Sequence, residues 1–130
     1  MELSDPQMND DNDVRTAPER EWPELLDAMV AAPEHHEVLL ENEQVRVLDS
    51  RIKPGETVPI HTHRWASVLH ILGTSDFIRY DAEGNTVFDS RTADSQIQTG
   101  AVVWSPALRP HSVENIGDTE IRVISIEVKD

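Results

Sequence analysis

Apolar and polar residues alternate along most of the chain after residue 36, the pattern of strands with one buried face. Turn-forming residues such as Pro54-Gly55 and Glu83-Gly84-Asn85 separate the alternating runs at intervals of roughly ten residues. The clearest runs are EVLLE, QVRVLDSRI, SVLHIL, DFIRYD, TVFDSR, AVVWS and IRVISIEV. Roughly eight to ten short strands at this spacing predict an all-β sandwich or barrel over residues 37–130.

The first 33 residues follow a different pattern. Residues 1–20 are polar and acidic, which predicts a flexible tail. Residues 21–33 place apolar side chains at helical spacing, and Pro33 ends the run, so we expect one short N-terminal helix there. Its predicted apolar stripe, which should pack on the barrel or on a second subunit, consists of Trp22, Leu25, Leu26, Met29 and Val30.

Composition narrows the class of protein. The 130 residues suit one domain, and the net charge of −14 opposes binding to nucleic acid or to an anionic membrane surface. No apolar run is long enough for a membrane helix, and the N-terminus does not have the pattern of a secretory signal. Cysteine is absent, which excludes disulfides and thiolate ligands. We therefore expect a cytoplasmic protein.

The most informative cluster is His61-Thr62-His63. Residues two apart on a strand point to the same face, so both imidazoles can reach one point inside a barrel. Neutral imidazole is a common ligand for Fe, Mn, Ni, Zn and Cu. An isolated pair of this kind also occurs as surface or core histidines, so the surrounding residues decide the interpretation.

Those surroundings resemble the two motifs of the cupin superfamily. PGETVPIHTH places Gly55 six residues before His61, and GAVVWSPALRPHSVEN repeats the family spacing of glycine, proline, histidine and asparagine. The resemblance covers about residues 38–128 and implies a double-stranded β-helix, or jelly-roll barrel. It also implies a divalent metal ion bound by His61, His63 and His111, a structural role for Asn115, and a homodimer.

The motifs depart from the family pattern at two places. Leu108 stands where the family has a glycine, and the first-motif glutamate is missing, since its candidate positions are Ser67 and Val68. Either the site uses three histidines, or the barrel has lost its metal and become a binding module. If Ser67 faces inward, His70 faces away; if Val68 does, His70 is a candidate fourth ligand.

The remaining candidates are less specific. We interpret His35 and His36 as surface residues in the linker after Pro33. The arginines at strand-like positions 51, 79 and 91 are expected on the outer face, although one of them could face a ligand.

The leading functional hypothesis is a metal-dependent, dioxygenase-like enzyme that acts on a small organic molecule. Without a carboxylate ligand the metal keeps a charge near +2, so we expect a substrate that binds through a carboxylate, enolate or similar oxyanion. The alternatives are a non-catalytic small-molecule binding or sensor protein and a metal-assisted isomerase or epimerase. The histidines alone do not separate these functions, because one fold serves many chemistries.

Overall fold

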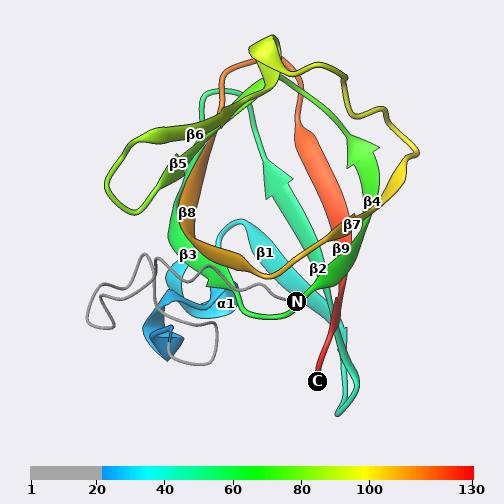
Figure 1. Ribbon diagram of the computed structural model, residues 1–130. Helices are drawn as coiled ribbons and strands as arrows, with labels where there is room; N and C mark the ends of the chain where they lie inside the picture. The colour runs from blue at the N-terminus through cyan, green and yellow to red at the C-terminus, as the bar shows by residue number, and fades with distance from the viewer. Residues whose placement is uncertain (1–21) are drawn as a thin grey trace.

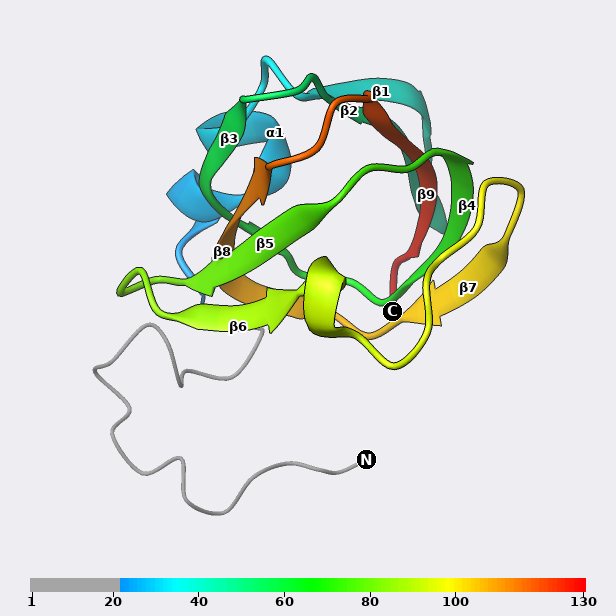
Figure 2. The same cartoon turned by 90° about the horizontal axis from the view of Figure 1, so that it is seen from above.

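The computed structural model describes residues 22–130 and shows nine strands among them, arranged as two facing antiparallel sheets (Figures 1 and 2). The five-stranded sheet has the order β1-β2-β9-β4-β7, and the four-stranded sheet has the order β3-β8-β5-β6. The strands are β1 (His36–Glu41), β2 (Val45–Ile52), β3 (Thr57–His63), β4 (Ser67–Gly73), β5 (Phe77–Asp81), β6 (Thr86–Asp89), β7 (Val102–Ser105), β8 (Leu108–Asn115) and β9 (Ile121–Val128). The predicted all-β double-stranded β-helix is confirmed.

The sheets enclose an interior that is apolar at one end. Ala32, Ile52 and Val58 form a buried cluster against which Val113 and Ile121 pack. Burial of such side chains contributes on the order of 1.5–3 kcal/mol each to stability. This cluster holds β2, β3, β8 and β9 together around the interior.

Three residues of the two motifs have the structural roles that the resemblance implies. Gly55 and Gly100 both have positive φ, at 84° and 93°, a backbone conformation that favours glycine. Asn115 is fully buried, and its side-chain amide donates hydrogen bonds to the carbonyls of Ile52 and Thr119, at 2.9 and 2.8 Å. Asn115 therefore ties the end of β8 to the end of β2 and to the loop that leads into β9.

The N-terminal segment differs from the predicted helix. A 3-10 turn, η2 (Glu24–Leu26), and a single α-helical turn, α1 (Ala28–Ala31), are separated by Asp27, whose ψ of 142° is not helical. The Asp27 carboxylate accepts a hydrogen bond from the backbone N–H of Met29 and so begins α1 as its N-cap. A short N-terminal helix is therefore present, but it covers only Ala28–Ala31 of the predicted range 21–33, because this capping residue begins it late.

The predicted apolar stripe was wrong for two of its five members, while Leu26 and Met29 are partly buried. Trp22, Ala28 and Ala32 are buried, whereas Leu25 is 76% exposed and Val30 is 55% exposed. Trp22 and the small alanines Ala28 and Ala32 pack the segment close to the barrel, where Asp27 forms an isolated parallel bridge with Thr62 of β3.

The predicted tail, residues 1–20, lies outside the described residues. A second short 3-10 turn, η3 (Ser90–Thr92), follows β6. None of the helices among residues 22–130 has the length and hydropathy to cross a membrane.

Candidate metal centre

His61 and His63 extend from the same face of β3 into the barrel, as the sequence pattern predicts. His111 lies opposite His61 in the register of β3 and β8, and the centroids of these two rings are 4.3 Å apart. The rings of His63 and His111 are 5.8 Å apart. Thus the structure brings the three predicted ligands together on two neighbouring strands.

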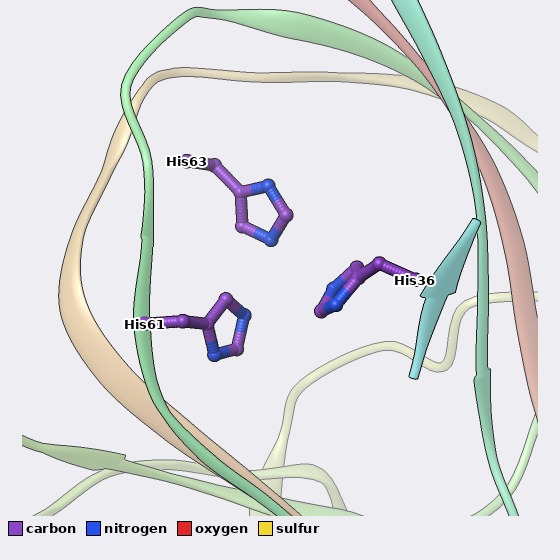
Figure 3. A group of neighbouring side chains, drawn as sticks. All are labelled: His36, His61 and His63. Atoms are coloured by element: carbon purple, nitrogen blue, oxygen red, sulfur yellow. The ribbon is translucent and has the colours of Figure 1, made fainter. Parts of the chain in front are cut away.

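A fourth histidine approaches from the other sheet. His36 at the start of β1 is only 6% exposed, and its ring lies 5.0 Å from that of His61 and 5.3 Å from that of His63. Figure 3 shows its imidazole facing the other two across the interior. One ligand nitrogen from each of these three residues lies within 4.8 Å of the others, so the group could hold a metal ion.

The interpretation of His35 and His36 as surface residues was therefore wrong. β1 pairs with β2 so that His36 stands opposite Ser50, and both residues line the interior. His35 is partly buried as well, with its Nδ1 3.0 Å from the carbonyl oxygen of Arg51. The only signal for His36 in the sequence is its place at the start of an alternating run.

All four rings are anchored through the same nitrogen. In three of them Nδ1 donates a hydrogen bond to a backbone carbonyl, which fixes the proton on Nδ1 and leaves the lone pair on Nε2. These contacts are His36 to Ala32 at 2.9 Å, His61 to Pro59 at 2.8 Å, and His111 to Arg109 at 2.6 Å. Hydrogen bonds of this kind, to groups that do not themselves bind the metal, orient imidazoles for metal binding.

His63 is anchored differently, by a carboxylate. Its Nδ1 donates to Oε2 of Glu127, at 2.9 Å, and Glu127 is fully buried on β9. Oε1 of Glu127 accepts from Nε of Arg46 at 2.6 Å, and both terminal nitrogens of Arg46 donate to Asp27, at 2.9 and 3.0 Å. A buried chain of alternating charge therefore connects the N-terminal segment to the histidine cluster.

The contacts of Glu127 and Asp27 determine the charge of these two carboxyl groups. Burial raises the pKa of Glu127, but hydrogen bonds from His63 and Arg46 outweigh it and bring the pKa below the ordinary value. The same holds for Asp27, whose pKa is lowered by Arg46 against the effect of burial. Both carboxyl groups are therefore ionised at neutral pH. Sequence reasoning missed Glu127, although Glu127 shares the inward face of β9 with apolar residues, which is an unusual place for a carboxylate.

Three of the four imidazoles, those of His36, His61 and His111, are neutral at physiological pH. Burial is the main cause that lowers the pKa of His36 to about 4 and that of His111 to about 3, and it also lowers the pKa of His61. Neutral imidazoles are the form that binds metal, so no proton has to be displaced from these nitrogens.

A cavity of about 390 Å³ opens from the cluster along the barrel interior. Ser67 is buried and lines the cavity with Leu69 and Ile71, whereas His70 is exposed. This settles the two alternatives for β4: Ser67 faces inward and His70 faces away. Ser67 offers no carboxylate, and His36 enters the cavity from β1 of the same five-stranded sheet.

Comparisons with solved structures place the chain among known barrels. A cupin domain from Bordetella pertussis Tohama I is 29% identical and superposes with a TM-score of 0.60, covering 73% of this chain and 92% of that one. An RmlC-like cupin with a double-stranded β-helix fold from Methanocaldococcus jannaschii is 16% identical, with a TM-score of 0.52, covering 72% of this chain and 78% of that one. The second shows the fold alone.

No protein-family model matches the sequence, and no curated protein matches it. The match with the Bordetella domain spans almost all of that domain. Together with the two histidine motifs and the double-stranded β-helix, it identifies this chain as a member of the cupin superfamily.

Proposed function

We propose that this chain is a metal-dependent, dioxygenase-like enzyme whose divalent metal is held by His36, His61, His63 and His111. The observation that supports the proposal is the anchoring of all four imidazoles through Nδ1 around one cavity. Histidines that were merely packed in a core would need no common tautomer. The proposal adds His36 to the three ligands predicted from the motifs.

The donor set fits a transition metal rather than magnesium or calcium. Imidazole nitrogen suits Fe, Mn, Ni, Zn and Cu, whereas the hard cations prefer oxygen ligands. Two atoms bound to one metal ion by bonds of about 2.1 Å lie at most about 4.2 Å apart. The ligand nitrogens of His36, His61 and His63, which lie within 4.8 Å of one another, therefore need only a small closing movement.

The protein residues have separate tasks at such a site. The carbonyl anchors and Glu127 hold each Nε2 toward the cavity, and the apolar walls of the cavity limit access of water. When bound, a redox-active ion such as iron supplies Lewis acidity and electron transfer to dioxygen. An ion held by these four residues would still have room on its cavity side for a small substrate.

The substrate is proposed to be a small organic anion. Four neutral imidazoles leave the charge of the ion near +2, and the nearest carboxylate, Glu127, already accepts hydrogen bonds from Arg46 and His63. An anionic ligand reduces the cost of holding that charge in a buried site.

Oxygen consumption tests the proposal. The metal-free protein is reconstituted with Fe, Mn, Ni, Zn or Cu and screened against small 2-oxo, 2-hydroxy and aromatic acids with an oxygen electrode. We expect oxygen uptake with one redox-active metal, lost in His63→Gln and kept in His70→Gln, which alters an exposed histidine of β4. Metal and acid binding without turnover would instead indicate the binding or sensor function.

A further inference from the structure

Arg79 lines the cavity, and its Nε atom has no hydrogen-bond partner in the described part of the chain. It lies on β5, opposite Val113 of β8 and Phe88 of β6, and both of these neighbours also line the cavity. Phe77, two residues earlier on the same face of β5, lies with its ring centroid 5.3 Å from that of Phe88. The surroundings of this guanidinium group within the sheet are therefore apolar.

The Nε atom of Arg79 is buried without a hydrogen-bond partner among residues 22–130. Burial lowers the pKa of Arg79, and no neighbouring acid offsets that effect. The one carboxylate lining the cavity, Asp76, accepts a hydrogen bond from the hydroxyl of Ser90 and forms no ion pair with Arg79 in the described part of the chain. Burial of an unpaired N–H group of a charged side chain is costly, and proteins normally pair such a group.

Arg79 is also the only lysine or arginine among the described residues that line the cavity. Arg51 and Arg91, the other two arginines at strand-like positions, are exposed and paired with Asp49 and Asp89. The cavity therefore has two groups that attract negative charge: the metal proposed at the histidine cluster, and the guanidinium group of Arg79, which lies within electrostatic reach of His111.

We infer that Arg79 binds a carboxylate of the substrate, so that the substrate is an organic acid whose apolar body lies against the apolar part of the cavity wall. The inference rests on the proposed function and narrows its substrate class. The planar guanidinium group offers paired N–H donors that match a carboxylate, and a low-polarity wall strengthens that contact. The apolar residues that line the cavity suit an aromatic or aliphatic body, and the cavity volume suits a ligand of modest size.

The test uses metal-free protein and a non-chelating pair of probes, 3-phenylpropionate and 3-phenylpropionamide. Near neutral pH in the presence of EDTA, isothermal titration should show the carboxylate binding at least about tenfold more tightly than the amide. Arg79→Met should abolish this preference, Arg79→Lys should keep part of it, and Arg91→Met should leave it unchanged.

Three results would overturn the inference: equal affinity for both probes, no carboxylate binding at millimolar concentration, or a preference that survives in Arg79→Met. Circular dichroism and metal binding of Arg79→Met check that the barrel is intact, and Arg79→Lys provides a second, charge-preserving variant. Because the titration uses metal-free protein, failure of the metal proposal leaves its result unaffected. Conversely, metal-dependent oxygen uptake without carboxylate preference would remove only the role of Arg79.

Discussion

Replacing Glu127 by glutamine tests the link between the buried charge chain and the histidine cluster. Glutamine has nearly the same shape as glutamate, but one of its two polar ends donates hydrogen bonds instead of accepting them. Glu127 accepts from two donors, Nε of Arg46 at 2.6 Å and Nδ1 of His63 at 2.9 Å. The variant can satisfy only one of these donors.

The loss of one donor affects either metal binding or stability, depending on which donor the glutamine oxygen accepts from. If the amide oxygen keeps Arg46, the amide N–H₂ group faces His63 and favours the tautomer with the proton on Nε2, which cannot bind metal. Loss of an orienting partner of this kind weakens metal binding about 10–100-fold, or about 1.4–2.7 kcal/mol. If the amide oxygen instead accepts the hydrogen bond from His63, Nε of Arg46 is left buried and unpaired, which costs about 1–3 kcal/mol of stability.

Competition with a chromogenic chelator measures metal affinity, and urea unfolding of the metal-free protein measures stability. Glu41→Gln is the matched control, because Glu41 also pairs with a cation, Lys129 at 2.7 Å, but at a side chain that is 44% exposed. If Glu127→Gln had the same metal affinity and the same stability as Glu41→Gln, the account of the charge chain would be refuted.

Four further predictions concern other parts of the molecule. Ser67→Glu should tighten metal binding by about an order of magnitude and weaken binding of anionic substrates, since it places a carboxylate on the cavity wall; unchanged chelator competition would contradict this. In the metal-free protein the pKa of His36 lies at about 4, below its ordinary 6.5, so unfolding takes up a proton and stability falls as the pH drops from 6.5 toward 4, by about 1.4 kcal/mol per pH unit for this residue. Denaturant unfolding should show a shallower pH slope in His36→Gln, and an identical slope would reject the assignment. Trp22→Ala should lower the free energy of unfolding by about 3–5 kcal/mol, and Leu25→Ala by less than about 0.5 kcal/mol, because Trp22 is 6% exposed and Leu25 is 76% exposed; equal losses would show that this segment does not pack as described. The predicted homodimer would be supported if light scattering gives a dimer that Trp104→Glu dissociates, since Trp104 is 62% exposed on an outer strand, and a monomeric parent protein would contradict it.

Local patterns in the sequence predict much of the barrel. Alternation identifies most strands, and the two-residue spacing of His61 and His63 places both rings on one face of β3 without knowledge of any partner strand. The motif spacing relates His111 to this pair, and the register of β3 with β8 then sets it opposite His61. These features depend on chain neighbours or on a recognisable motif.

The features that were missed depend on pairing between distant segments. His36 faces the interior because β1 pairs with β2, and nothing in residues 33–36 specifies which face of that sheet it will occupy. The hydrogen bond between Glu127 and His63 joins residues 64 positions apart, and Arg46 completes the chain from a third strand. Asp27 interrupts the predicted helix because its carboxylate both caps α1 and receives Arg46.

Metal content most directly tests the central claim, that four histidines form a metal centre. The full chain is expressed without a polyhistidine tag, purified without a nickel column, and analysed by inductively coupled plasma mass spectrometry beside His36→Gln, His111→Gln and His70→Gln. The account predicts about one transition-metal ion per chain in the parent protein and in His70→Gln, and a large loss in the other two variants. A parent protein that neither contains nor takes up a transition metal, or full occupancy in both His36→Gln and His111→Gln, would contradict it.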